Sequence, residues 1–114
     1  MKAAWALAVL AAACSAHGPA PARQQSLVAL SRVLGESHAI RRACEGTDDQ
    51  FWRGRMQQLL DAEDPGMRAR LSVAFNDAYN AGQAHYRTCS ARARAGANRI
   101  AASGRSLSES LEGP

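Results

Sequence analysis

Apolar residues recur at three- and four-residue steps along most of the chain, and this spacing places them on one face of an α-helix. The first such stretch predicts a helix over residues 24–43. Gly35 lies inside it, where glycine costs about 1 kcal/mol relative to alanine, so it indicates either close packing against another helix or a local weakness. The predicted apolar face of this helix comprises Leu27, Leu30, Val33, Leu34, Ser37 and Ile40.

A second helix is predicted over residues 48–63. Gly46 can adopt the left-handed conformation that ends the first helix. Thr47, with Gln50 three residues later, has the form of a capping box at the start of the second. The side chains expected to be buried on this helix are Trp52, Met56, Leu59 and Leu60.

The third helix has the longest regular pattern in the chain. Asp64 suits its N-cap, and Pro65 suits the first helical position, where the missing N–H is not needed. An apolar stripe then continues for about six turns. The residues of this stripe are Met67, Leu71, Phe75, Ala78, Gly82, either His85 or Tyr86, and Cys89.

A fourth helix begins after Ser90, a residue that can cap it. Small side chains make up most of its apolar seam, and small side chains bury little area. We therefore expect this helix to be the least stable and to fray after Ser106. The seam consists of Ala93, Ala97, Ile100, Gly104, Leu107 and Leu111.

These patterns predict an all-α fold, a small up-down bundle of three to four helices. Consecutive helices joined by short loops pack antiparallel, so the C-terminal ends of the first and third helices meet at one end of the bundle. Cys44 lies at one of these ends and Cys89 at the other. In an oxidising compartment we expect them to form a disulfide. Closing a loop of about 45 residues stabilises the fold by about 4 kcal/mol in the chain-entropy model.

A metal site is the competing interpretation of the same cysteines. His85 and Cys89 are four residues apart on one helix face, and His38 and Cys44 could supply two further ligands. However, His38 and Cys44 are six residues apart and do not share a helix face, and the chain has no Cys-x-x-Cys pair. We therefore favour the disulfide and expect no metal and no cofactor.

The N-terminal residues 1–22 have the pattern of a secretory signal peptide. One cation, Lys2, precedes a run of small apolar residues over 3–13 that is too short to span a bilayer. This pattern predicts a helical domain over 23–111, a tail over 112–114, and a periplasmic or secreted protein. The residues before Cys14 also resemble a bacterial lipobox, so lipidation of Cys14 and membrane anchoring are the alternative to simple cleavage.

The formal net charge is +4, and all basic residues except Lys2 are arginines. No acidic residue occurs between Asp77 and Glu109, whereas five arginines do. The Arg-rich fourth helix could contact an anionic membrane or a partner, although a charged helix face is most often solvated. Export and the absence of a recognition motif argue against nucleic acid as a partner.

Two short segments carry a resemblance to a known family. These are Trp52 to Met56, with the pattern Trp-Arg-x-Arg-Met, and Tyr86 to Cys89, with the pattern Tyr-Arg-Thr-Cys. With Leu34-Gly35-Glu36 and the residues around Phe75, they resemble a family of small exported alphaproteobacterial helical proteins of unknown function. The resemblance covers residues 27–92. It implies export and the cysteine pair, and it leaves the activity open.

The sequence carries no known catalytic motif, and its serines and histidines are scattered. Glu36 and Glu63 could form a carboxylate pair, but arginines surround both, which favours surface ion pairs. The sequence thus predicts a non-enzymatic accessory or binding module that acts on an envelope protein or an anionic ligand. The alternative is a small metal-dependent or hydrolytic envelope enzyme.

Polar residues mixed with aromatic ones suggest a binding surface for an anionic or sugar-like ligand. The alternative is structural, because aromatic residues at helical spacing usually pack in a core. The candidate residues of this surface are Arg53, Arg55, Arg70, Asn76, Tyr79 and Tyr86.

Overall fold

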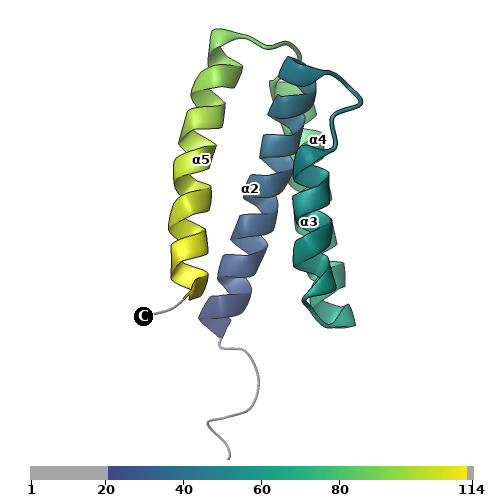
Figure 1. The fold of residues 1–114 in the computed structure, drawn as a ribbon, viewed down its shortest axis with the longest axis vertical. Helices are drawn as coiled ribbons and strands as arrows, with labels where there is room; N and C mark the ends of the chain where they lie inside the picture. Colours follow the sequence, from purple (N-terminus) through teal and green to yellow (C-terminus); the bar gives the residue numbers. More distant parts are fainter. Residues whose placement is uncertain (1–20, 113–114) are drawn as a thin grey trace, which may run out of the picture.

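The computed structural model describes residues 21–112, which form four helices and no strand. They are α2 (Pro21–Glu45), α3 (Phe51–Asp61), α4 (Pro65–His85) and α5 (Ala91–Glu112). Figure 1 shows them side by side, joined by short connections. The predicted all-α fold is confirmed. Lys2, Cys14 and nearly all of the predicted signal peptide lie outside the described residues, as do the last two residues of the tail.

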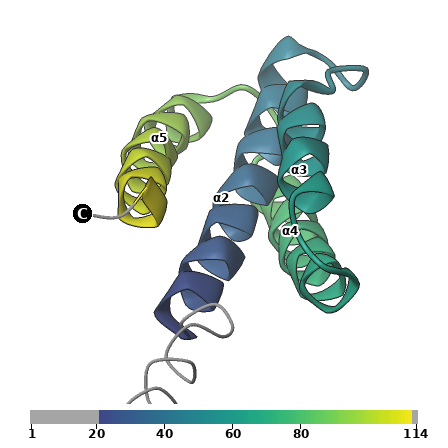
Figure 2. The ribbon, with the colours of Figure 1, turned by 60° about the horizontal axis from the view of Figure 1, so that its bottom comes forward.

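Helix α2 is the centre of the arrangement. It packs against α3, α4 and α5, whereas α5 packs against α2 and against neither α3 nor α4. Figure 2 shows α5 standing apart from the layer formed by α3 and α4. Two different faces of α2 are therefore buried, one beside α3 and α4 and one beside α5. The sequence pattern had predicted a single apolar face.

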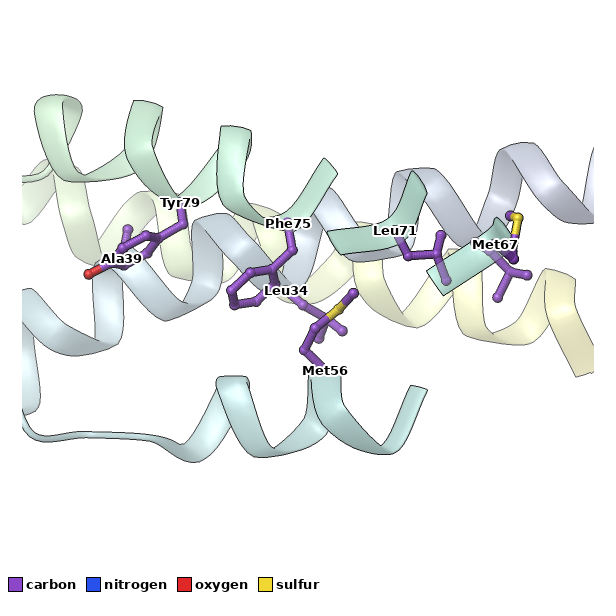
Figure 3. Packing of buried hydrophobic residues seen from close by; sticks show 8 residues of the cluster. Leu34, Ala39, Met56, Met67, Leu71, Phe75 and Tyr79 are labelled. Carbon is purple, nitrogen blue, oxygen red and sulfur yellow. The ribbon is translucent and has the colours of Figure 1, made fainter. Parts of the chain in front are cut away.

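The larger core lies between α2, α3 and α4. Phe75 and Leu71 on α4 face Leu34 on α2, and Met56 on α3 closes this core from the third side (Figure 3). Gly35 allows the close approach of α2 to α4, because a Cβ atom built there would collide with the carbonyl oxygen of Phe75. Close packing is thus the reason for a glycine inside this helix, and not a local weakness.

A smaller core joins α5 to the other face of α2. It is formed by Ile40, Tyr86, Ala93 and Ile100, with Cys44 packed against it. The Cys44–Cys89 disulfide closes this end of the bundle, with 4.6 Å between the two Cα atoms. The predicted pairing is confirmed. Cys89 does not end the third helix as expected, however, because α4 stops four residues earlier at His85.

Three of the predicted helix ends are confirmed. The Asp64 carboxylate accepts a hydrogen bond from the backbone N–H of Met67 at 2.9 Å, with Pro65 in the first turn. The Ser90 hydroxyl accepts one from the N–H of Ala93 at 3.2 Å. Gly46 has φ +116°, in the left-handed region that ends α2.

The predicted capping box at Thr47 is wrong. Helix α3 begins at Phe51, and Gln50 at the N-cap position makes no side-chain capping bond. Asp49 takes this role instead, because its carboxylate accepts the N–H of Phe51 at 3.1 Å and is held by Arg41 at 2.9 Å. A contact to a distant helix therefore overrides the local sequence signal.

The fourth helix also differs from its prediction. It continues to Glu112, so the expected fraying after Ser106 is wrong, and a physical reason is that Leu111 packs against the larger core. Ala97, predicted to lie in the apolar seam, is exposed. At the end of α4, Tyr86 is buried and His85 is exposed, which settles the alternative left open by the sequence.

Candidate functional site

The most prominent hollow in the described structure is a groove between α2 and α5, about 600 Å³ in volume. We call it the α2–α5 groove. Its lining is mostly apolar, and a single residue of α3, Trp52, borders it. The lining residues are Leu30, Val33, Leu34, Ser37, Ile40, Arg41, Cys44, Glu45, Trp52, Cys89, Arg94, Ala97, Ile100, Ala101, Gly104, Arg105 and Ser108.

The groove exists because the flank of α5 that faces it carries small side chains. Ala97, Ala101 and Gly104 succeed one another at four- and three-residue steps on this flank. Gly104 lies close to α2, since a Cβ atom built on it would be 3.3 Å from Val33 Cγ1. Because α5 is out of contact with α3, the space between them is left open above α2.

The two ends of the groove differ in charge. At the end near the disulfide, the cation Arg94 is accompanied by Glu45, and Arg41 forms an ion pair with Asp49 at 2.9 Å. At the other end, Arg105 is the charged lining residue, with Ser108 one turn further along α5. The disulfide end is therefore close to neutral in charge, whereas the opposite end is cationic.

A smaller cavity of about 300 Å³ lies on the other flank of α5. The Tyr86 hydroxyl donates a hydrogen bond to Glu36 at 3.0 Å, and Arg99 binds the same carboxylate oxygen at 2.9 Å. Burial, together with the hydrogen bond to Glu36 and its charge, raises the pKa of Tyr86. This network ties α5 to α2 through one carboxylate oxygen of Glu36. The expectation that Glu36 is an ion-pair partner is confirmed, and Glu63 likewise pairs with Arg23 at 3.3 Å.

His38 is completely buried in the larger core, a position that the sequence pattern did not predict. Its ring lies against Phe75 and Tyr79, at centroid distances of 5.8 and 4.8 Å. Neither ring nitrogen has a hydrogen-bond partner among the described residues. Burial lowers the pKa of His38, and the nearby cations Arg53 and Arg42 lower it further. The ring therefore behaves as a neutral core side chain.

The six residues proposed as a binding surface do not share one cavity. Arg53 and Asn76 border a small hollow of about 120 Å³ between α3 and α4. Arg70 borders a different, shallow hollow beside α2, and Tyr86 borders the cavity next to Arg99. The remaining two residues, Tyr79 and Arg55, each lie against aromatic side chains. Tyr79 is buried in the larger core, and Arg55 lies over the ring of Phe51 at 5.3 Å.

The four residues of the alternative metal site are not available together as ligands. Cys44 and Cys89 are bonded to each other, so neither can supply a thiolate ligand. His38 is in the core and His85 is on the surface. Within residues 21–112, no group of three or more His, Cys, Asp or Glu side chains is placed to hold a metal ion.

The pattern of apolar residues did not predict the α2–α5 groove. A signal for it was present, because the fourth predicted helix has alanine, glycine or serine at most positions of one flank. This signal became informative only when the structure showed that α5 has a single neighbouring helix. Within the described part of the chain, none of the helices is long and apolar enough to cross a membrane.

Comparison with known proteins identifies a family. The family described as "Protein of unknown function (DUF2385)" matches residues 22–113, nearly all of the predicted mature chain. The chain belongs to this family. No curated protein and no solved structure matches this chain.

Proposed function

We propose that this protein is an exported, non-enzymatic binding module of the cell envelope, and that it binds its ligand in the α2–α5 groove. The groove itself is the observation that carries the proposal. A mostly apolar hollow of about 600 Å³ has the size and character of small-molecule sites in proteins. A hollow of this volume and lining fits the binding of an apolar ligand.

Two further features support the location and the class. The signal-like N-terminus and the Cys44–Cys89 disulfide both fit an oxidising compartment outside the cytoplasm. The polar clusters are also committed to structure, since Glu36 is bound by Tyr86 and Arg99. A binding role uses the groove and requires no reactive group.

The proposal is tested with N-phenylnaphthylamine, an uncharged apolar dye whose fluorescence rises in a hydrophobic site. The disulfide-intact mature protein is titrated with the dye, and the variant Ala101→Phe is compared with the matched control Ala102→Phe. Ala101 lines the groove, whereas Ala102, its exposed neighbour on the same helix, does not. We expect the control to bind like the native protein, and Ala101→Phe to bind about tenfold more weakly because the ring fills the groove.

The same titration with Ala97→Phe repeats the test at a second position of the groove wall. Both variants are first checked for an intact disulfide and an unchanged melting temperature. Absence of dye binding by the native protein would contradict the proposal. Equal binding by all folded variants would also contradict it, because the dye would then occupy another surface.

A further inference from the structure

We propose that the ligand of the α2–α5 groove is a long-chain fatty acid, with its carboxylate beside Arg105 and its acyl chain running toward the disulfide. This inference deepens the proposed function and rests on it, because it requires the groove to be the binding site. The length of the groove, the chemistry of its two ends and the charge at each end support it.

The length of the groove matches one acyl chain. On α2 its lining extends from Leu30 to Glu45, and on α5 from Arg94 to Ser108. These segments are about 22 Å and about 21 Å long at a rise of about 1.5 Å per residue. An acyl chain in one leaflet of a bilayer spans about half of the hydrocarbon thickness of about 30 Å. The groove therefore holds one such chain and leaves room for a headgroup at one end.

The apolar floor defines where the chain would lie. Leu34, Ile40 and Ile100 are buried at the base of the groove. At one end the disulfide and Trp52 supply apolar surface, beside the charged residues Arg41, Glu45 and Arg94, whose charges are nearly balanced once Asp49 is included. Each methylene group that leaves water for such a surface contributes about 0.8 kcal/mol to binding. The methyl end of the chain thus belongs beside Trp52 and the disulfide.

The charge distribution places the carboxylate at the opposite end. No groove-lining carboxylate lies beside Arg105, and none of the three ion pairs found within residues 21–112 includes it. Glu109, one turn further along α5, does not line the groove. A guanidinium matches a carboxylate with two parallel hydrogen bonds, and the two unit charges cancel. Ser108, one turn further along, offers an additional hydroxyl donor. By contrast, Glu45 at the disulfide end would repel an anion.

A single guanidinium also favours a carboxylate over a phosphate monoester. The phosphate carries a charge of about −1.5 to −2 at neutral pH, which Arg105 alone would not neutralise. The competing occupant of another class is an acidic amphipathic helix of a partner protein. We favour the fatty acid because the charged lining residue at the end opposite the disulfide is the single cation Arg105, which matches one carboxylate and not the several acidic residues of such a helix.

The test compares palmitate with hexadecanol, which has the same chain and no charge, on the disulfide-intact mature protein. Displacement of N-phenylnaphthylamine is measured below the micelle concentration of palmitate and below the solubility limit of hexadecanol. We expect palmitate to bind about tenfold more tightly than hexadecanol, which corresponds to about 1.4 kcal/mol. Arg105→Gln should remove this preference without weakening hexadecanol. The control Arg92→Gln, an exposed cation of α5 outside the groove, should retain it.

Several results would overturn the inference. Equal binding of the two lipids would show that no carboxylate is recognised. If Arg94→Gln and not Arg105→Gln abolished the preference for palmitate, the carboxylate would lie at the disulfide end of the groove. Tighter binding of lysophosphatidic acid would indicate a phosphate ligand, and displacement of the dye by an acidic amphipathic peptide but not by palmitate would indicate a partner helix. Failure of both lipids and of the dye would instead refute the proposed function itself.

Discussion

Replacing Gly35 by alanine should destabilise the protein, although alanine is the better helix former. Gly35 faces α4, and a Cβ atom at this position would collide with the carbonyl oxygen of Phe75. It would also lie 3.1 Å from the carbonyl carbon of Phe75 and 3.1 Å from the Cβ of Ala78. Ordinary contacts between carbon atoms are about 3.5–4.0 Å. Two of these three obstacles are backbone atoms, which cannot rotate away, so α2 and α4 must separate.

The magnitude follows from two opposing effects. Alanine in place of glycine inside a helix gains about 1 kcal/mol. Overpacking a close helix contact costs about 1–3 kcal/mol, and an obstacle made of backbone belongs at the upper end of this range. The net effect of Gly35→Ala is therefore a loss of about 2 kcal/mol in the free energy of unfolding. For a domain of this size, this loss lowers the melting temperature by about 10 °C.

Gly54→Ala is the matched control. Gly54 is also inside a helix, and no atom lies within 4 Å of a Cβ built there. This variant should therefore gain about 0.5–1 kcal/mol. Thermal and urea unfolding followed by circular dichroism measure both variants. A Gly35→Ala variant as stable as the native protein would contradict this prediction, because α2 and α4 would then not be in close contact at this position.

Three further predictions concern the disulfide, the buried histidine and the N-terminus. Replacing both Cys44 and Cys89 by serine should lower the free energy of unfolding by about 4 kcal/mol, because a loop of 45 residues is no longer closed. The same replacement should weaken dye binding in the α2–α5 groove. Urea unfolding measures the change in stability, and a loss below about 1 kcal/mol would contradict the prediction. Burial and neighbouring cations lower the pKa of His38 in the folded state below its ordinary value of 6.5, so the unfolded chain takes up the proton first. The free energy of unfolding should thus be highest above about pH 7 and fall as the pH drops through 6.5. Urea titrations should show this fall for the native protein and for the control His85→Asn, but not for His38→Phe. Mass spectrometry of the exported protein should show an N-terminus within residues 16–24 and no acyl group, whereas an acyl mass on Cys14 would establish the lipoprotein alternative.

Features that depend on neighbouring residues in the chain could be predicted from the sequence. Asp64 and Ser90 cap their helices because each side chain needs only an N–H group three residues later. Thr47 has an equally good local signal and fails. Arg41, on another helix, holds Asp49 and moves the start of α3 to Phe51. Local signals thus succeed where no distant side chain competes for the same groups.

The candidate site depends on relations between helices, which the pattern of apolar residues does not contain. Both faces of α2 carry apolar residues, and the pattern alone merged them into one. His38 belongs to the face beside α4, but histidine is not an apolar residue, so the pattern did not predict its burial. The α2–α5 groove depends on α5 having one neighbouring helix, and this is a property of the packing. The residues of the groove could be read from the sequence only after that arrangement was known.

The groove and the disulfide are linked by the position of α5. Larger side chains in place of Ala97, Ala101 and Gly104 would bury more apolar area, at about 25 cal/mol per Å², so the open groove represents stability that the fold does not gain. A helix with one neighbour and a small-residue flank needs another restraint. Cys89 lies two residues before α5 and is bonded to the end of α2, so the disulfide fixes α5 beside α2 at one end of the groove. In this view the disulfide supports binding directly, because it holds the second wall of the groove beside the first.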